Sequence, residues 1–246
     1  MFAAGYTTRR FLTLRRVLCT LLLLIFPFTV QGQVTPAPVH SYRETVDNAS
    51  TYFYWRMEEN GQQRIIFVQE KNKTFVISCS DNGETRRYQV KDSNIHHDIL
   101  AERQDDELKI SGIRHGKAYS ETVKLDKRPW YQALSYSLRT FLESEDGTMT
   151  FWTIRNDTLK VTSLQAEKEG EEEILVHGKK IAAHRVVLRA DGFYASFWHG
   201  TYWYRKGDML FLMYRSVHGP PGTAETVVEL LEEAAVPGKF LFTDGQ

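Results

Sequence analysis

The sequence predicts a mainly β protein: one curved antiparallel sheet, or a half-open or closed β-barrel built as a meander, with a single packed α-helix. Short segments rich in β-branched and aromatic residues follow one another along most of the chain. Asn60-Gly61 and Asn82-Gly83 separate them as hairpin signals. Apolar residues recur at helical spacing only near residues 129–143. Together these patterns are typical of an antiparallel meander with one helical insertion.

The first 32 residues have the pattern of a secretory signal peptide. Residues 1–16 contain four arginines and no acidic residue, and a run of 14 mostly apolar residues, Val17–Val30, follows. Gly32 is small, as the residue before a cleavage site should be. A membrane-spanning helix needs about 20 apolar residues, so this run predicts a cleaved signal at residues 1–32. An uncleaved N-terminal anchor is the alternative.

The chain that remains after cleavage is mildly acidic. The four arginines leave with the signal, so 27 of the 31 basic residues and all 31 acidic residues remain, which gives a net charge of −4. This balance gives no electrostatic reason to bind nucleic acid. Of the two cysteines only Cys79 remains, so no intramolecular disulfide can form. We therefore expect an exported bacterial protein, in the periplasm, with no stable transmembrane anchor after cleavage.

The body of the protein is expected to be one antiparallel β domain at residues 41–233. A Pro-rich flexible leader, residues 33–40, precedes it, and a C-terminal tail, residues 234–246, follows. In the first half, alternating or aromatic-rich segments predict strands at 51–57, 64–69, 73–80, 85–91, around 108–110 and at 119–125.

The helix is expected at Pro129–Glu143. Asp126 is placed to cap it, and proline is well tolerated in a first helical turn. The apolar positions with helical spacing are Trp130, Leu134, Leu138, Phe141 and Leu142. This apolar stripe is expected to cover one end or one face of the sheet.

Strands resume after the helix, with one acidic interruption. Glu167–Glu173 contains five glutamates and is most simply a solvated turn region. Gly219-Pro220-Pro221-Gly222 predicts a rigid turn. The strands are expected at 149–154, 158–165, 174–177, 180–189, 194–199, 201–205, 209–217 and 226–231.

No catalytic motif stands out. The chain has no Gly-x-Ser-x-Gly elbow, phosphate loop or His-Glu-x-x-His sequence. His96-His97-Asp98 is a candidate metal-ligand group, with a polar turn as the alternative. Asp105-Asp106-Glu107 offers paired carboxylates but is more simply a solvated loop, and Cys79 alternates with apolar residues like a core residue. We predict no catalytic residue, metal or cofactor.

The aromatic residues of the second half carry the main functional signal. Between Phe193 and Tyr204 large rings occupy both parities of an extended segment, and Met209–Tyr214 is apolar on both parities. A sheet with one wet face would alternate, so this part should be covered on both sides. Ordinary core filling explains this pattern, and a hydrophobic groove or cavity is the alternative. The candidate ligand-lining residues are Trp130, Trp152, Trp198, Tyr202 and Trp203.

Residues 129–230 also resemble a known family. The similar segments are Pro129-Trp130-Tyr131-Gln132, Phe151–Arg155, His177-Gly178, Phe197-Trp198, Tyr202–Tyr204, Gly219–Thr223 and Val227–Leu230. They resemble the exported bacterial proteins of domain-of-unknown-function family 3108, and cover about half of the processed chain. The resemblance implies an antiparallel β protein outside the cytoplasm and assigns no catalytic residue. By looser analogy, such curved exported sheets are similar to periplasmic lipoprotein carriers that hold acyl chains.

Three functions are consistent with these observations. The first is a non-enzymatic envelope protein that binds a lipid-like ligand or an envelope protein on a concave sheet face. The second is an envelope hydrolase acting on glycan or lipid, which would need two carboxylates about 5–10 Å apart in a groove. The third is a scaffold that binds a partner through an exposed sheet edge.

Overall fold

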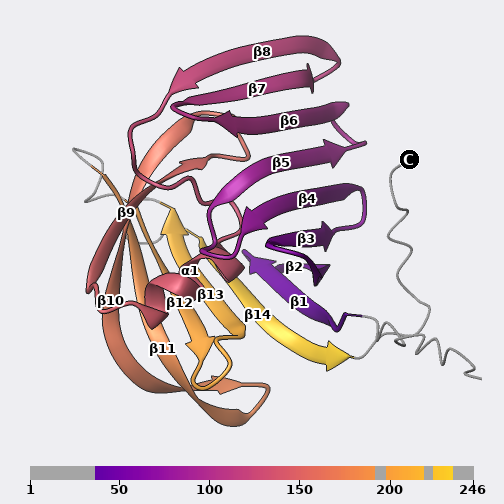
Figure 1. Cartoon of the computed structure of the whole chain (residues 1–246). Coiled ribbons are helices and arrows are strands. Elements are labelled where there is room, and N and C mark those ends of the chain that lie inside the picture. Colours follow the sequence, from indigo (N-terminus) through magenta and orange to yellow (C-terminus); the bar gives the residue numbers. More distant parts are fainter. Residues whose placement is uncertain (1–36, 192–197, 219–223, 235–246) are drawn as a thin grey trace, which may run out of the picture. The chain divides into compact units, whose positions relative to one another are not determined.

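The protein is described by a computed structural model that covers residues 37–191, 198–218 and 224–234. These residues form one curved antiparallel sheet of 14 strands, which does not close into a barrel, and one α-helix (Figure 1). The predicted fold class is confirmed. The strands are β1 Val39–Val46, β2 Ala49–Asn60, β3 Gln63–Gln69, β4 Lys73–Ser80, β5 Thr85–Asp92, β6 His97–Gln104, β7 Glu107–Arg114, β8 Lys117–Lys124, β9 Thr148–Ile154, β10 Val161–Val176, β11 Lys179–Ala190, β12 Trp198–Arg205, β13 Phe211–His218 and β14 Glu225–Ala234.

Two meanders make up the sheet. Strands β1 to β8 pair in chain order, and so do β9 to β14. The two runs join where β1 pairs with β14, from Val39 opposite Ala234 to Val46 opposite Thr226. Strands β8 and β9 are therefore the two ends of the sheet, although α1, Leu134–Glu143, is the only regular element between them in sequence.

Short turns set the register of the hairpins. The two-residue loop between β2 and β3 is Gly61-Gln62, because Asn60 already pairs with Gln63. The turn therefore lies one residue later than the Asn60-Gly61 pair suggests, with Gly61 supplying a φ of 60°. Asn82-Gly83 lies in the turn between β4 and β5, as the sequence predicts.

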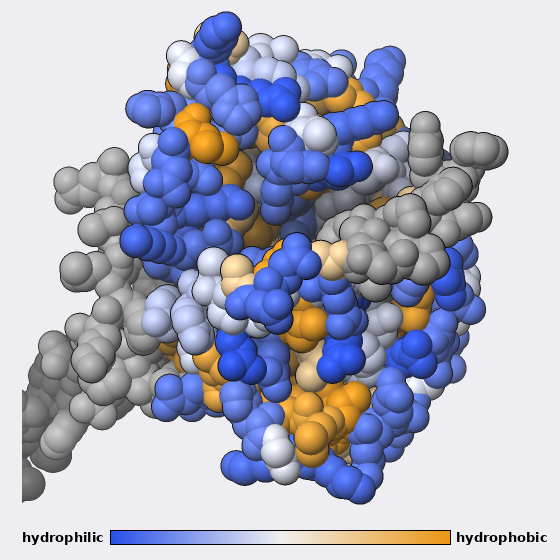
Figure 2. Space-filling model, turned by 180° about the vertical axis from the view of Figure 1, so that it is seen from behind, coloured by the Kyte–Doolittle hydropathy of each residue, from blue (hydrophilic) through white to orange (hydrophobic). Residues whose placement is uncertain are grey.

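Cross-strand register places the core on the inner face of the sheet. Trp55 lies opposite Val68, Val68 opposite Phe75, and Phe75 opposite Val90, so these side chains share one face. On the outer face ion pairs link neighbouring strands, such as Lys91 to Asp98 at 3.4 Å. Seen from behind, the surface is mostly hydrophilic with smaller hydrophobic patches (Figure 2). The alternation thus separates an apolar face from a wet one.

Helix α1 begins five residues later than expected. Residues before it are extended instead: Trp130 forms an isolated bridge with Trp152 of β9. Asp126 does not cap the helix, because its carboxylate accepts hydrogen bonds from the Arg128 backbone N–H at 3.0 Å and from Trp152 Nε1 at 2.9 Å. Ala133 occupies the N-cap position, with no side-chain cap. Pairing with the sheet edge has prevailed over the helical pattern at residues 129–133.

Helix α1 packs on the inner face of the sheet and joins the two meanders. Its Ser137, fully buried, donates a hydrogen bond to the Gly83 carbonyl at 2.7 Å in the β4–β5 turn. From the other meander, the Tyr204 hydroxyl of β12 donates to the Leu134 carbonyl at 2.7 Å. Figure 1 shows α1 between the two runs of strands. The expectation that the helix covers the sheet is met by these contacts and by the burial of Leu138 and Phe141.

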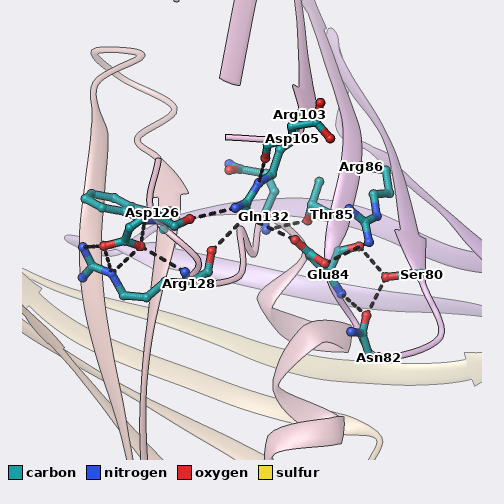
Figure 3. A network of polar contacts seen from close by, with 11 residues as sticks. Ser80, Asn82, Glu84, Thr85, Arg86, Arg103, Asp105, Asp126, Arg128 and Gln132 are labelled. Carbon is teal, nitrogen blue, oxygen red and sulfur yellow. Dashed lines mark hydrogen bonds and ion pairs between the residues drawn. The ribbon is translucent and has the colours of Figure 1, made fainter. Parts of the chain in front are cut away.

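A polar network fixes the segment that leads from β8 to α1 (Figure 3). Arg103 of β6, whose side chain is 8% exposed, donates to the Arg128 carbonyl at 2.8 Å and the Asp126 carbonyl at 2.9 Å, and pairs with Glu84 at 3.2 Å. Thr85 accepts a hydrogen bond from the Gln132 backbone N–H at 2.9 Å. The crossing segment is therefore held by side chains of the first meander.

Three segments differ from the sequence-based expectations. Glu167–Glu173 is not a solvated turn: it lies within β10, where Glu172 pairs opposite Ala183 of β11. Its carboxylates form ion pairs with basic side chains, for instance Glu169 with Arg185 at 3.3 Å, and Gly170 accommodates a register shift. Strands β1 and β6 were not predicted from the sequence. Strand β6, His97–Gln104, is a full strand between β5 and β7.

Several expectations fall on residues outside the described ranges. They include the signal peptide at 1–32, the leader up to residue 36, Phe193, Phe197, the 219–222 turn and the tail from residue 235. Strand β1 begins at Val39, two residues before the expected start of the domain. Within the described ranges, no helix has the length and apolar character needed to cross a membrane.

Candidate functional site

An apolar cavity of about 200 Å³ lies on the inner face where the two meanders meet. Strands β1 to β3 contribute one wall, strands β12 to β14 another, and the first turn of α1 a third. The lining residues are Tyr42, Phe53, Trp55, Val68, Leu134, Ser135, Tyr202, Phe211, Tyr214 and Val228. An apolar cavity of about 150 Å³ is already large enough to bind benzene, so this one can accept a ring or a stretch of acyl chain.

Ring contacts hold the cavity walls in place. Tyr42 stacks between Phe53, with ring centroids 5.2 Å apart, and Phe211, at 5.4 Å, and its hydroxyl donates to the Phe211 carbonyl at 3.0 Å. Tyr202 packs against Tyr214 with ring centroids 4.7 Å apart. Aromatic pairs at such distances add stabilisation beyond the area they bury. The rings on the two meanders thus form one packed cluster across the β1–β14 junction.

Glycine makes room for one of these rings. A Cβ on Gly200 of β12 would lie 2.7 Å from Cε2 of Tyr214, closer than carbon atoms approach one another. Because Gly200 has no side chain, the Tyr214 ring can lie across β12 next to Trp198. Gly200 therefore helps to shape the cavity wall without lining it.

Burial keeps the tyrosine hydroxyls of this cluster neutral. The pKa of Tyr42 is raised well above its ordinary value by desolvation, and so are the pKa values of Tyr202 and Tyr204. Across physiological pH these groups present apolar rings and neutral hydroxyls. The cavity wall made by the tyrosines carries no charge.

The five predicted lining residues are only partly brought together. Tyr202 lines the cavity, and Trp198 lies on the same face of β12. Trp130 is fully buried, and Trp152 lies against Arg128, with the guanidinium 4.1 Å from its ring centroid. Trp203 faces the other side of the sheet, where its Nε1 donates to Glu172 at 2.7 Å. The ligand-binding role of these residues stays a prediction.

The sequence-based list missed most of the wall. Phe53 and Trp55 share one parity in β2, and Phe211 and Tyr214 lie in the apolar segment already noted for both parities. The four consecutive aromatic residues at 52–55 were a usable signal for the first meander. The sequence pattern does not show that β1 and β14 pair, and this pairing is what brings the two segments together.

The candidate polar groups do not assemble into a catalytic or metal site. Within residues 37–191, 198–218 and 224–234, no three His, Cys, Asp or Glu side chains are grouped so that they could hold a metal ion. His97 is buried with its ring centroid 5.7 Å from that of His115. Asp105 and Asp106 lie in an exposed turn, and Cys79 is a buried free thiol, as expected of a core residue.

Comparison with known proteins supports the fold. No known protein family and no curated protein matches the chain. A β-barrel-like protein of domain-of-unknown-function family 1849 from Brucella abortus aligns with a TM-score of 0.57 and 9% identity, over 81% of this chain and 98% of that one. The hypothetical lipoprotein YmcC from Escherichia coli aligns with a TM-score of 0.39 and 12% identity, over 81% and 89%.

These similarities concern architecture. At 9% identity the family 1849 structure shares the β-barrel-like fold with this chain, and nothing further follows from it about function. The resemblance to family 3108 is not among the matches, and membership of that family stays a prediction. The shared architecture is therefore that of the β-barrel-like family 1849 structure.

Proposed function

We propose that this protein is a non-enzymatic, exported envelope protein that binds an apolar or amphiphilic ligand in the cavity on its inner sheet face. The observation that carries the proposal is the cavity itself, about 200 Å³ and lined by rings and aliphatic side chains from both meanders. Ligand sites in proteins are typically concave and mostly apolar, with few polar groups. The N-terminal signal pattern supports export to the periplasm.

A first test is native mass spectrometry on protein isolated gently from the envelope of its own cells. A bound mass of lipid size is expected, because an apolar cavity favours ligands that water solvates poorly. A protein that carries no extra mass and takes up no apolar probe would contradict the proposal.

A cavity-filling substitution gives the sharper test. Val228→Phe adds a ring where Val228 lines the cavity and is 8% exposed, whereas Val46→Phe adds the same ring at a position that is 37% exposed on β1. We expect Val228→Phe to reduce the affinity for the neutral fluorophore N-phenylnaphthylamine at least tenfold, and Val46→Phe to leave it unchanged. Thermal unfolding of both variants checks that the fold is retained. Equal affinity in Val228→Phe and wild type would show that the probe binds elsewhere.

The hydrolase hypothesis has less support from the geometry. Among the described residues, none that lines the cavity is an Asp, Glu or His. The carboxylates of Asp105 and Asp106 lie on an exposed turn, away from the lining. A groove for acid–base chemistry would need such groups facing each other across it.

A further inference from the structure

A cation lies beside one wall of the cavity. Arg139 lies one helical turn after Ser135 on α1, and its Nε donates to the Ser135 carbonyl at 3.4 Å. Its guanidinium carbon is 5.6 Å from the ring centroid of Trp55 and 5.8 Å from that of Tyr136. Since Trp55 and Ser135 both line the cavity, this positive charge lies beside the cavity wall, although Arg139 is not itself a lining residue.

Arg139 is partly buried, and no described carboxylate forms an ion pair with it. Asp208, whose pKa Arg139 lowers, and Glu233, which acts together with Arg139 on the pKa of His40, are both bound to another cation, Arg205. Arg139 acts on the pKa of Asp208 only from a distance. Partly buried arginines are usually paired, so a cation held on two aromatic rings beside a cavity is suited to an anion from outside the chain.

Two buried polar atoms beside Arg139 also lack partners. Nε1 of Trp55 and Nδ1 of His40 are both buried and make no hydrogen bond, and the two rings lie 5.4 Å apart. Trp55 is 5% exposed and is itself a cavity wall. Buried polar atoms in proteins nearly always have partners, so these two atoms add to the polar groups next to the cavity that have no partner within the described residues.

We propose that the ligand is a single-chain anionic amphiphile, with a carboxylate or phosphate head held by Arg139 and its apolar chain in the cavity. This inference rests on the proposed function and names its ligand class. The volume of about 200 Å³ suits part of one acyl chain rather than two. Arginine is suited to the head because its planar N–H groups bind carboxylate and phosphate in pairs.

The experiment compares dodecanoate with dodecanol by isothermal titration on delipidated protein isolated from cells that express the full chain. The two probes have the same chain and differ in the charge of the head. We expect wild type to bind dodecanoate about tenfold or more tightly than dodecanol, since a charge-assisted hydrogen bond is retained in one complex only. Arg139→Gln should reduce dodecanoate affinity to that of dodecanol, and Arg139→Lys should retain part of the preference.

Arg114→Gln is the matched control. Arg114 also lies over a ring, 5.5 Å from the centroid of Tyr119, but belongs to β7 and does not line the cavity. The Arg114→Gln substitution removes the same charge, so this variant should prefer dodecanoate over dodecanol as strongly as wild type does. Circular dichroism and thermal unfolding verify that each variant is folded.

The outcomes separate the two proposals. Equal affinities of wild type for both probes would overturn the anionic head and leave the apolar-ligand function standing. A preference that survives in Arg139→Gln would also overturn it, because the anion would then bind elsewhere. If neither probe binds, the proposed function itself fails. Should Arg139→Gln not fold, the wild-type comparison together with Arg139→Lys still decides: a wild-type preference that Arg139→Lys leaves unaltered counts against Arg139.

Discussion

At the scale of single residues, Cys79 illustrates how burial controls chemistry. Its side chain is fully buried on the inner face of β4, next to the Thr85 hydroxyl at 3.8 Å. Burial raises the pKa of the thiol to about 11, since desolvation disfavours the thiolate. The thiolate is the reactive form of cysteine, so this thiol should be inert in the folded protein.

We predict that Cys79 reacts with Ellman's reagent at pH 8 only after unfolding. The reaction is measured in native buffer and in guanidinium chloride, and the Cys79→Ser variant gives the signal that other thiols contribute. Fast reaction of the native thiol would contradict the burial of β4.

The same raised pKa of Cys79 has a thermodynamic consequence. The folded protein holds this proton more tightly than the unfolded chain, so stability falls as pH rises from about 9 through about 11. Over this pH range the free energy of unfolding of the wild-type protein should fall by about 2 kcal/mol more than that of Cys79→Ser.

At the scale of elements, the segment between β8 and α1 depends on one buried side chain. Arg103 binds the carbonyls of Asp126 and Arg128 and the carboxylate of Glu84, and it is 8% exposed. This segment in turn supplies Trp130, whose carbonyl accepts a hydrogen bond from the Thr85 backbone N–H at 2.8 Å. The position of α1, and with it one wall of the cavity, follows from these contacts.

We predict that Arg103→Gln lowers the free energy of unfolding by about 3 kcal/mol, because it leaves Glu84 and two carbonyls without their buried partner. Arg87→Gln is the control. Arg87 pairs with Glu102 on the outer face, where the two side chains are 50% and 38% exposed, and its loss should cost less than about 1 kcal/mol. Urea denaturation measures both. Similar losses in the two variants would mean that the network does not fix the segment.

The alternation of apolar and polar residues predicted those strands whose position depends on neighbouring residues in the sequence. Strand β4 has the bounds Lys73–Ser80 that its alternation predicts, and Cys79 lies in the core as expected. Glu167–Glu173 was misinterpreted because the basic residues that neutralise it, Arg185 and Arg189, lie on the partner strand. The cavity could not be predicted, since its walls meet only through the β1–β14 pairing of distant segments.

At the scale of the whole molecule, the two edge strands of the sheet, β8 and β9, are covered to different degrees. The backbone of residues 129–131 covers part of β9: the Trp152 N–H donates to the Pro129 carbonyl at 2.8 Å, and the Tyr131 N–H to the Trp152 carbonyl at 2.8 Å. Strand β8 pairs only with β7 among the described strands. Exposed edges template pairing with other chains, and charged side chains commonly protect them. On β8 these include Glu121 and Lys124, both exposed.

We predict that the double variant Glu121→Val, Lys124→Val self-associates, because it removes charge from the edge and adds β-branched side chains without altering net charge. The control, Glu102→Val with Lys109→Val, makes the same exchange at a cross-strand pair on β6 and β7, which have neighbours on both sides. Size-exclusion chromatography with light scattering at several concentrations measures the mass. A monomeric edge variant, or equal association of the control, would contradict a role for β8.

The pairing of β1 with β14 sets the order of events during synthesis. Val39 and Ala234 are partners in the sheet, yet a ribosome makes them far apart in time. Until β14 has been made, β1 has only β2 beside it and the cavity lacks one wall. Neighbouring strands of each meander can pair as they are made, whereas contacts between distant segments form slowly. The β1–β14 junction, and with it the cavity, is therefore expected to be the last part of the sheet to form.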